Sequence, residues 1–470
     1  MKMLIAGEWV ENESRIEVTN PFDGSVIDTV PCADASDVER ALAGAVRGAE
    51  AMRKLSARER SEILARAAGI LRERSPDFAE TIAREVGKTL REAEIEVDRA
   101  SQTLVIASEE AKRIHGEMIP FDASPGGETK MGFYMRVPVG VVLAITPFNV
   151  PLNLACHKLA PAIAAGNAVI LKPATATPLA DLKLGQVLLD AGLPPEAISV
   201  VTGRGGAIGN LLISDPRVRL VTFTGSPEVG ESITKAAGLK KTAMELGSNS
   251  CVIVMDDADI GDAALRVRRG GYAVAGQVCI SVQRVIVHQA VYDDYLKALL
   301  PLVGGIRTGD QLDPSTDMGP MISEDEAKRV ENWIGEAVRA GAKCLLPAKR
   351  EGAILSPSIL VDVTPEMKVW AKELFGPLVC VVKCRDFEHA IELANTSDYG
   401  LQAGIFTKNL NLALRAIREI DVGGLMVNDA PAYRADAMPY GGVKRSGFGR
   451  EGPKFAIEEM TEIKVVAFQM

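Results

Sequence analysis

The uncharged stretch VPVGVVLAITPFNVPLNLAC, residues 137–156, decides the class of fold. It approaches the ~20 apolar residues that a bilayer-spanning helix needs. However, Pro138, Pro147 and Pro151 would break such a helix, and two asparagines, one of them Asn149, would be costly in lipid. We therefore interpret the stretch as a buried strand followed by a loop, and we expect no membrane partner.

On the carboxyl side of this stretch, short apolar runs alternate with segments of helical spacing. The runs of a first series are VGVVLAI (139–145), NAVILKP (167–173), AISVVTG (197–203), RLVTFTG (219–225) and KTAMEL (241–246). Those of a second series are CVIVM (251–255), QRVIVHQ (283–289), PLVCVVK (377–383) and LQAGIFT (401–407). Such alternation is typical of βαβ units with parallel sheets, so we predict two α/β units.

The segments that flank these series have other patterns. Residues 57–115 are rich in charge with helical spacing, which predicts a long helical region. Residues 119–136 hold Pro, Gly and Ser in their middle and are interpreted as a protruding hairpin. The final EIKVVAFQM, residues 462–470, is a short strand without an obvious partner in either unit. A neighbouring subunit usually covers such a strand, so we predict an oligomer, with completion of an internal sheet as the alternative.

The composition limits the class of protein and the compartment. The 470 residues exceed the ~250–300 at which one core stops growing, and 53 Lys and Arg stand against 62 Asp and Glu. No basic run with interleaved aromatic residues occurs, so we expect no nucleic-acid partner. Seven scattered cysteines and a short apolar run near the amino terminus predict a cytoplasmic protein. Four histidines and one close cysteine pair, Cys380 and Cys384, do not predict a metal site.

Glycine-rich turns are the candidates for a nucleotide site. GFGREG, residues 447–452, has the spacing of a dinucleotide fingerprint but starts no βα unit, so we interpret it as a turn. Gly225 and Ser226 lie between a strand and a helix, and Gly203 has a comparable place. The N–H groups at either helix start could hold a phosphate, with Lys172 as a cation at the same sheet edge. Ordinary turn glycines are an equal alternative.

Eight stretches are more specific together than any one of them is alone. They are, in chain order, TPFNVPLN, GNAVILKPATATPL, FTGSPEVG, MELGSNS, GQVCIS, KELFGP, YGLQAGIF and MPYGGVKRSGFGREG. In this order they resemble the NAD(P)-dependent aldehyde dehydrogenase superfamily over essentially the whole chain. The resemblance implies an α/β fold with a Rossmann-like cofactor domain, an α/β catalytic domain and a small β oligomerisation arm, in a homodimer or homotetramer.

The same resemblance implies boundaries for these parts. They are residues 1–118 and 137–246 for the cofactor domain, 247–428 for the catalytic domain, 119–136 and 455–470 for the arm, and 429–454 for a substrate loop and return segment.

The family's catalytic roles carry over by place in the motifs. Cys279 in GQVCIS matches the nucleophile, which forms a thiohemiacetal with the aldehyde and, after loss of hydride, a thioester. Asn149 matches the oxyanion donor, with helix capping as its alternative role. Glu245 in MELG matches the base that activates water, and its presence implies a free carboxylic acid as product. Without the resemblance, Glu245 would be interpreted as a solvated surface charge.

The cofactor residues are implied in the same way. They are Lys172, Thr175, Gly203, Thr224, Gly225, Ser226, Glu373 and Phe375. Lys172 and Glu373 match ribose-binding residues, and Phe375 matches a residue beside the nicotinamide. Thr175 stands where NAD-preferring relatives often carry a glutamate for the adenosine ribose. The absence of that carboxylate removes repulsion against a 2′-phosphate, so we predict that NADP is accepted as well as NAD.

The substrate is less determined by the sequence. GQVCISVQRV, HKLAPAI and YRADAMPYGGVKRSGFGREG are similar to the lactaldehyde, non-phosphorylating glyceraldehyde 3-phosphate and phosphonoacetaldehyde dehydrogenase branch. Arg434 could pair with an anionic group of the substrate, and an ordinary surface arginine is the alternative. His157 and Tyr433 are further pocket candidates. Val278 and Val150 replace an arginine and a tyrosine of relatives that oxidise glyceraldehyde 3-phosphate, which argues against that substrate.

We expect a small 2-hydroxyaldehyde or a short anionic aldehyde, and we favour a lactaldehyde-type substrate. Phosphonoacetaldehyde, a sulfonated aldehyde, succinate semialdehyde and glyceraldehyde 3-phosphate are the alternatives. A catalytically silent structural homologue is opposed by the joint presence of the catalytic motifs. A Cys–His hydrolase that uses Cys156 or Cys279 is a remaining alternative, and it would need no nucleotide.

Overall fold

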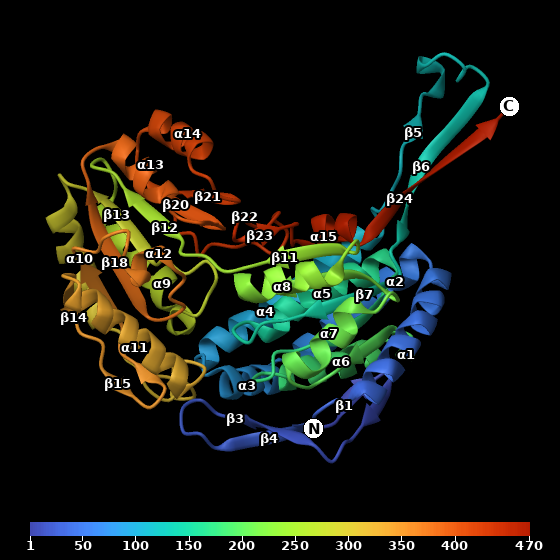
Figure 1. Ribbon diagram of the computed structural model, residues 1–470, viewed down its shortest axis with the longest axis horizontal. Coiled ribbons are helices and arrows are strands. Elements are labelled where there is room, and N and C mark those ends of the chain that lie inside the picture. The colour runs from blue at the N-terminus through green and yellow to red at the C-terminus, as the bar shows by residue number, and fades with distance from the viewer.

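The computed structural model describes residues 1–470, which form two α/β units and a projecting arm (Figure 1). The first unit has an eight-stranded sheet in the order β2-β1-β9-β8-β7-β10-β11-β23. Its strands are β1 (Met3–Ile5), β2 (Glu8–Val10), β7 (Val141–Ile145), β8 (Ala168–Lys172), β9 (Ile198–Val200), β10 (Val218–Thr224), β11 (Lys241–Glu245) and β23 (Gly447–Phe448). β7 to β11 pair in parallel, which confirms the predicted series. The pairs β1–β2, β1–β9 and β11–β23 are antiparallel.

The uncharged stretch lies at the centre of this sheet. β7 pairs with β8 on one side and with β10 on the other, and most of its side chains are buried. After a short loop, helix α5 (Pro151–Ala165) begins with Pro151 at a first-turn position, where its missing N–H costs nothing. The predicted loop is therefore shorter than expected, because its second half is helical. Every residue of α5 is buried, so no polar stripe marks the helix in the sequence.

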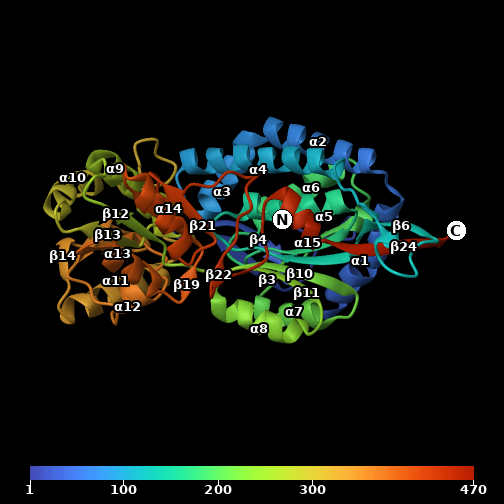
Figure 2. The same cartoon turned by 90° about the horizontal axis from the view of Figure 1, so that it is seen from above.

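Helices cover both faces of the first sheet. They are α1 (Ala35–Lys54), α2 (Ala57–Glu73), α3 (Ser75–Val86), α4 (Leu90–Ala111), α5, α6 (Leu179–Asp190), α7 (Gly205–Ser214), α8 (Pro227–Ala237) and α15 (Pro453–Glu459), with the 3-10 turn η2 (Pro195–Ala197). Figure 2 shows α2, α4, α5 and α6 on one face and α7 and α8 on the other. The predicted helical region is confirmed as α2, α3 and α4, whereas α1 is an additional helix that Asp34 caps.

The second unit has a seven-stranded sheet in the order β14-β17-β18-β13-β12-β20-β21. Its strands are β12 (Cys251–Val254), β13 (Arg284–His288), β14 (Lys343–Leu346), β17 (Ser358–Val361), β18 (Leu378–Cys384), β20 (Gln402–Phe406) and β21 (Gly424–Val427). All neighbours are parallel except β14 and β17, so the second predicted series is also confirmed.

The helices of the second unit surround this sheet and complete a separate core. They are α9 (Ile260–Tyr272), the 3-10 turn η3 (Ala273–Gly276), α10 (Tyr292–Gly304), α11 (Glu324–Arg339), α12 (Lys368–Ala371), α13 (Phe387–Asn395) and α14 (Leu410–Glu419). The two units hold separate clusters of 72 and 49 buried hydrophobic residues, as expected for a chain too long for one core.

The arm is a three-stranded sheet that projects from the first unit (Figure 1). It consists of β5 (Met118–Ile119), the 3-10 turn η1 (Phe121–Ala123), β6 (Lys130–Pro138) and β24 (Thr461–Gln469). β24 is antiparallel to β6 over its whole length. The terminal strand thus lies outside both units, as predicted, and its partner is β6 of the same chain. Pairing within one chain agrees with the alternative of an internal sheet, while the other edge of β24 has no neighbouring strand.

Short strand pairs complete the fold. They are β3 (Arg15–Thr19) with β4 (Val26–Pro31), β15 (Arg350–Glu351) with β16 (Ile354–Leu355), and β19 (Tyr399–Gly400) with β22 (Val443–Lys444). Gly447, Gly449 and Gly452 of GFGREG have φ of 108°, 88° and 97°, and the stretch predicted as a turn begins with strand β23 at Gly447. None of the helices is both long and apolar enough to cross a membrane.

Candidate active site

A cavity of about 810 Å³ has walls from both units. One wall is the loop after β7 with the ends of β10 and β11, and the other comes from α11, α12 and their neighbouring loops. The predicted residues that line it are Cys279, Glu245, Asn149, Thr224, Gly225, Ser226, Glu373 and Phe375. Because parallel strands end at one sheet edge, side chains distant in sequence meet there.

A strained left-handed turn precedes the Cys279 loop. Val274 and Ala275 have φ of 50° and 52°, and Gly276 follows with φ of 72°. Each non-glycine residue in this region costs ~1–2 kcal/mol. A Cβ added to Gly276 would lie 2.1 Å from the carbonyl oxygen of Gly376. The turn therefore requires glycine at its last position, because another backbone packs against it.

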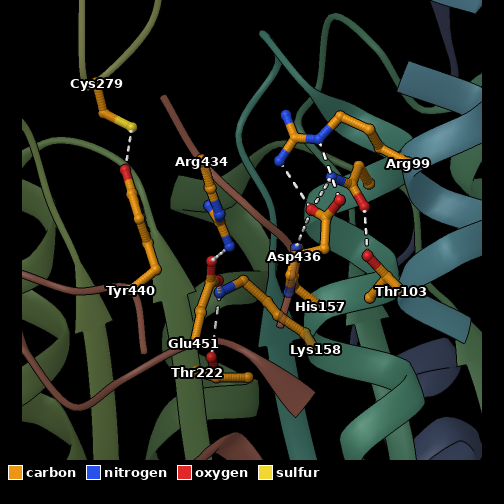
Figure 3. Close-up of polar contacts among 11 residues, drawn as sticks. Arg99, Thr103, His157, Lys158, Thr222, Cys279, Arg434, Asp436, Tyr440 and Glu451 are labelled. Carbon is orange, nitrogen blue, oxygen red and sulfur yellow. Dashed lines mark hydrogen bonds and ion pairs between the residues drawn. The ribbon is translucent and has the colours of Figure 1, made fainter. Parts of the chain in front are cut away.

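The Cys279 thiol is half-buried, with its Sγ 2.9 Å from the hydroxyl oxygen of Tyr440 (Figure 3). Burial raises the pKa of Cys279 to about 11, although the hydrogen bond to Tyr440 acts in the opposite direction. Cys279 is therefore a neutral thiol near neutral pH, and it must lose a proton before it can act as a nucleophile.

Asn149 is held in the loop between β7 and α5. Its Nδ2 donates a hydrogen bond of 2.7 Å to the carbonyl oxygen of Gln277, two residues before Cys279. The side chain does not cap α5, because the Glu96 carboxylate accepts the hydrogen bonds from the N–H groups at the helix start. The capping alternative is therefore wrong. A side-chain amide has two N–H donors, so one is left for a ligand oxygen.

Glu245 ends β11 and lines the cavity with only 5% of its surface exposed. Its Oε2 is buried and has no hydrogen-bond partner. Burial raises the pKa of Glu245 well above its ordinary value, and the charge of Glu451 raises it further. The interpretation as a solvated surface charge is therefore wrong. A carboxylate with a raised pKa suits proton transfer from water.

A row of buried charges leads away from the thiol (Figure 3). The Arg434 guanidinium lies 3.8 Å from the ring centre of Tyr440 and pairs with Glu451 at 2.8 Å. Glu451 also pairs at 3.0 Å with Lys158, which is fully buried in α5. The Nε of Arg434 is buried without a hydrogen-bond partner. Arg434 is therefore not a surface arginine, and its Nε remains free to donate a hydrogen bond.

Asp436 holds a second polar cluster next to this row (Figure 3). Its carboxylate lies 2.7 Å from Arg99, 3.0 Å from Nε2 of His157 and 3.1 Å from Nδ2 of Asn153. Burial acts to raise the pKa of Asp436, but the hydrogen bonds from His157 and Arg99 outweigh it and lower the pKa. None of the three predicted substrate residues, His157, Tyr433 and Arg434, lines the cavity, and Tyr433 is 54% exposed.

Three predicted cofactor residues lie outside the cavity, around the ends of β8 and β9. The Nζ of Lys172 donates 2.6 Å to the carbonyl oxygen of Pro173, and burial lowers the pKa of Lys172 to about 8. The Thr175 hydroxyl donates 3.3 Å to the carbonyl oxygen of Gly203. Gly205 then begins α7. These residues share the sheet edge with the cavity, because β7 to β10 are parallel.

The wall from the second unit carries Glu373 and Phe375. Glu373 accepts a hydrogen bond of 2.9 Å from the N–H of Ser248, and burial raises its pKa to about 7. Phe375 has φ of 54° and meets the ring of Phe148 edge-on, with ring centres 5.8 Å apart. The two rings thus join the walls of the cavity.

Three residues of the buried row, Lys158, Tyr440 and Glu451, were not among the predicted site residues. Only Lys158 had a local signal, since it is the one charged residue of α5. A buried lysine needs a partner, so its position marks a buried polar site. Tyr440 and Glu451 come from irregular segments, where no period shows which side chains point inward.

Comparison with known proteins agrees with this geometry. Residues 9–466 match the model of the aldehyde dehydrogenase family. The 3-sulfolactaldehyde dehydrogenase of Priestia megaterium is 49% identical over 469 residues, which cover 100% of this chain and 98% of that protein. The lactaldehyde dehydrogenase of Methanococcus maripaludis is 39% identical over 468 residues, which cover 99% of this chain and 99% of that protein.

A solved structure agrees equally well. The NADP-dependent glyceraldehyde-3-phosphate dehydrogenase from Bacillus halodurans, complexed with NADP, superimposes with a TM-score of 0.97 at 37% identity. The match covers 100% of this chain and 99% of that one. The fold class and the resemblance drawn from the eight motifs are thus confirmed: the chain belongs to the aldehyde dehydrogenase family and is an oxidoreductase that acts on aldehydes.

Proposed function

We propose that this protein oxidises a short anionic 2-hydroxyaldehyde of the 3-sulfolactaldehyde type to the free carboxylic acid, with NADP or NAD. The observation that carries the proposal is Arg434, whose buried Nε has no partner and whose ring neighbour Tyr440 contacts the Cys279 thiol. 3-Sulfolactaldehyde is lactaldehyde with a sulfonate, so it combines the hydroxyaldehyde favoured by the sequence with an anion for Arg434. Guanidinium donates strong charge-assisted hydrogen bonds to such oxyanions.

The direct test is the formation of reduced cofactor with a panel of aldehydes. It comprises 3-sulfolactaldehyde, lactaldehyde, phosphonoacetaldehyde, succinate semialdehyde and glyceraldehyde 3-phosphate. We expect the highest kcat/KM with 3-sulfolactaldehyde. Equal or better use of neutral lactaldehyde would contradict an anion site, and no reduction with any aldehyde would contradict the proposed function.

In this proposal, Cys279 forms the bond to the aldehyde carbon after its thiol has lost a proton to solvent water. Negative charge then moves onto the aldehyde oxygen, where the free N–H of Asn149 stabilises it. One such donor is worth ~3–4 kcal/mol of transition-state stabilisation. A bound nicotinamide dinucleotide supplies the hydride acceptor that converts the thiohemiacetal into a thioester.

Glu245 is proposed to take a proton from the water that attacks the thioester. It lines the same cavity as Cys279, and its unpaired Oε2 leaves a place for that water. Because the pKa of Glu245 is raised, the basic form gains population as the pH rises. Hydrolysis should therefore become faster toward alkaline pH.

We expect Glu245→Gln to separate the two halves of the reaction. A first turnover of reduced cofactor should remain, while steady-state kcat falls by about 10²–10⁴-fold, because general-base catalysis is lost. Rapid mixing measures the burst, and mass spectrometry detects the acyl group on Cys279. Glu228→Gln, an exposed glutamate on the cavity rim, is the control. Loss of the burst itself would instead assign Glu245 to ionisation of the thiol.

The strand ends of the first sheet fit a nicotinamide dinucleotide. Gly225 and Ser226 lead into α8 at the cavity, and Gly205 begins α7, which has no side-chain cap. Lys172 contacts only a backbone carbonyl through its Nζ, so its charge is not neutralised by a carboxylate. Two helix starts and an unpaired cation at one sheet edge suit a pyrophosphate and its riboses. We propose that this edge, with Glu373 and Phe375 opposite, holds the cofactor.

Thr175 is proposed to decide the use of NADP. We expect Thr175→Glu to raise the KM for NADP by about tenfold or more, because the new carboxylate would repel the 2′-phosphate. The KM for NAD should change much less. Steady-state kinetics with both cofactors measures the effect, and Thr175→Gln, which has the same size without the charge, is the control. An equal change of KM for both cofactors would show that Thr175 does not lie near the 2′-phosphate.

The domain division implied by the resemblance is also proposed, with 1–118 and 137–246 for cofactor, 247–428 for catalysis, and 429–454 as substrate loop. Residues 119–136 and 455–470 are proposed to join subunits in a homodimer or homotetramer. The outer edge of β24 and the edge strand β21 both lack a neighbouring strand. Apolar side chains on β24 are exposed, and a second copy of this chain would cover them. The seven scattered cysteines, an odd count without a framework spacing, support a cytoplasmic location.

We expect the double change Ile463→Lys and Val465→Lys to lower the molecular mass of the assembly. The two side chains are 57% and 58% exposed on one face of β24, and lysine opposes strand association. Size-exclusion chromatography with light scattering measures the mass. Lys464→Gln, on the other face of the same strand, is the control. An unchanged mass would place the subunit contact elsewhere.

A further inference from the structure

The turn before Cys279 is held by a side chain from α4. Oε1 of Glu92 accepts a hydrogen bond of 2.9 Å from the backbone N–H of Val274. Oε2 of the same carboxylate accepts hydrogen bonds of 2.9 Å and 2.8 Å from the N–H and the hydroxyl of Thr89, in the capping box of α4. One carboxylate thus ties the start of a helix to the loop that carries the thiol.

Val274 and Ala275 need such support. A β-branched residue with positive φ is a true outlier, and strained backbone of this kind persists only where its surroundings hold it. The carbonyl oxygen of Val274 accepts hydrogen bonds of 3.0 Å from both the N–H and the Nε2 of Gln277. The N–H of Val274 is held by Glu92. Because Val274 is buried, loss of the carboxylate would leave this N–H without its hydrogen-bond acceptor.

The turn also fixes the parts of the site that follow it. Asn149 donates its hydrogen bond to the carbonyl oxygen of Gln277, which is the last residue before Val278 and the Cys279 thiol. If the turn relaxed toward right-handed backbone angles, Gln277 would move and the contact of Cys279 with Tyr440 would be lost. A misplacement of 1 Å is enough to slow a reaction by about 10²-fold.

We propose that Glu92 is a positioning residue for the reaction, because it holds the left-handed turn that sets the Cys279 thiol against Tyr440. The inference rests on the proposed function, in which Cys279 is the nucleophile. Glu92 itself does not line the cavity, so it acts through the backbone of Val274.

Four variants test this role by kinetics. Glu92→Ala should lower kcat by about tenfold or more and leave the Kd for NADP within about twofold, because only the nucleophile moves. Glu92→Gln keeps one acceptor oxygen for the Val274 N–H and gives up the acceptor for Thr89, so it should retain most of the activity. Thr89→Ala weakens the cap of α4 but leaves the Val274 contact, so it should also stay active. Added to Glu92→Ala, Ala275→Gly should recover part of the loss, since glycine adopts positive φ without strain.

The opposite pattern would overturn the proposal. If Glu92→Gln loses as much kcat as Glu92→Ala, or if Thr89→Ala shows the same loss of kcat, Glu92 serves only the stability of α4. If Ala275→Gly recovers none of the kcat lost in Glu92→Ala, backbone strain in the turn does not explain that loss.

Hydrogen exchange tests the contact without any substrate. In a peptide covering residues 272–281, the Val274 amide should be protected in the wild type, Glu92→Gln and Thr89→Ala, and should lose protection in Glu92→Ala. Unchanged exchange in Glu92→Ala overturns the proposal even if kcat falls. If exchange changes as expected but a Cys279→Ser variant still oxidises aldehydes, the proposed function is wrong, and Glu92 holds a turn with no part in the reaction.

Discussion

Replacement of Cys279 by alanine is expected to lower kcat/KM for every aldehyde by a factor of about 10⁴ or more, because the covalent route is lost. Cys279 is the only cysteine that lines the cavity, so no other thiol can take its place. The Kd for NADP should stay within about twofold, since the residues proposed to hold it lie on strand ends that the change does not touch. Stopped-flow absorbance and a fluorescence titration measure the two quantities. Cys344→Ala, a half-buried cysteine of β14, is the matched control and should remain active.

The pH dependence of the first turnover should identify the thiol as the reacting group. With a pKa of about 11, the thiolate at pH 8 is only ~0.1% of Cys279. Since the pKa lies above the working range, the rate of hydride formation should keep rising with pH and not level off near the ordinary thiol pKa of ~8.5.

Residual turnover above about 1% in Cys279→Ala would exclude the covalent route, because it exceeds what such variants retain.

The two sheets could be predicted because their central strands are buried on both faces and form continuous apolar runs. The same burial hid α5, since a helix without a polar face has no 3.6-residue period to detect. No local pattern predicted the pairing of β24 with β6, and only the family resemblance grouped residues 119–136 with 455–470 in one arm. β6 lies far away in the chain, and nothing local in either strand specifies which edge it joins.

The motifs located Cys279, Glu245 and Asn149, and the folded chain brings all three to one cavity. What the motifs could not supply are contacts between irregular segments, such as Arg434 on the ring of Tyr440. The Glu92 contact was hidden for another reason. Thr89-Leu-Arg-Glu92 is fully explained as a helix capping box, and a valine normally predicts a strand, not a left-handed turn.

Replacement of Arg434 by glutamine should lower kcat/KM for 3-sulfolactaldehyde by about 10²–10³-fold and that for lactaldehyde by less than about fivefold. Loss of one partner of a buried charge pair costs ~3–4 kcal/mol, and each 1.4 kcal/mol is about a factor of ten. The two substrates differ only in the sulfonate. Damage to the rest of the site therefore affects both equally and cancels in the ratio of the two kcat/KM values.

The variant should remain folded, because Glu451 keeps its ion pair with Lys158 at 3.0 Å when the guanidinium is removed. Arg434→Lys, which keeps the charge but not the planar fork, should recover only part of the preference for 3-sulfolactaldehyde. Arg445→Gln is the control, because this half-exposed arginine pairs only with Glu228 and Glu231. An equal fall for both substrates in Arg434→Gln would mean that Arg434 only holds Tyr440 against Cys279. The anion would then have to be bound elsewhere, and the half-exposed Arg99 beside Asp436 would be the next residue to change.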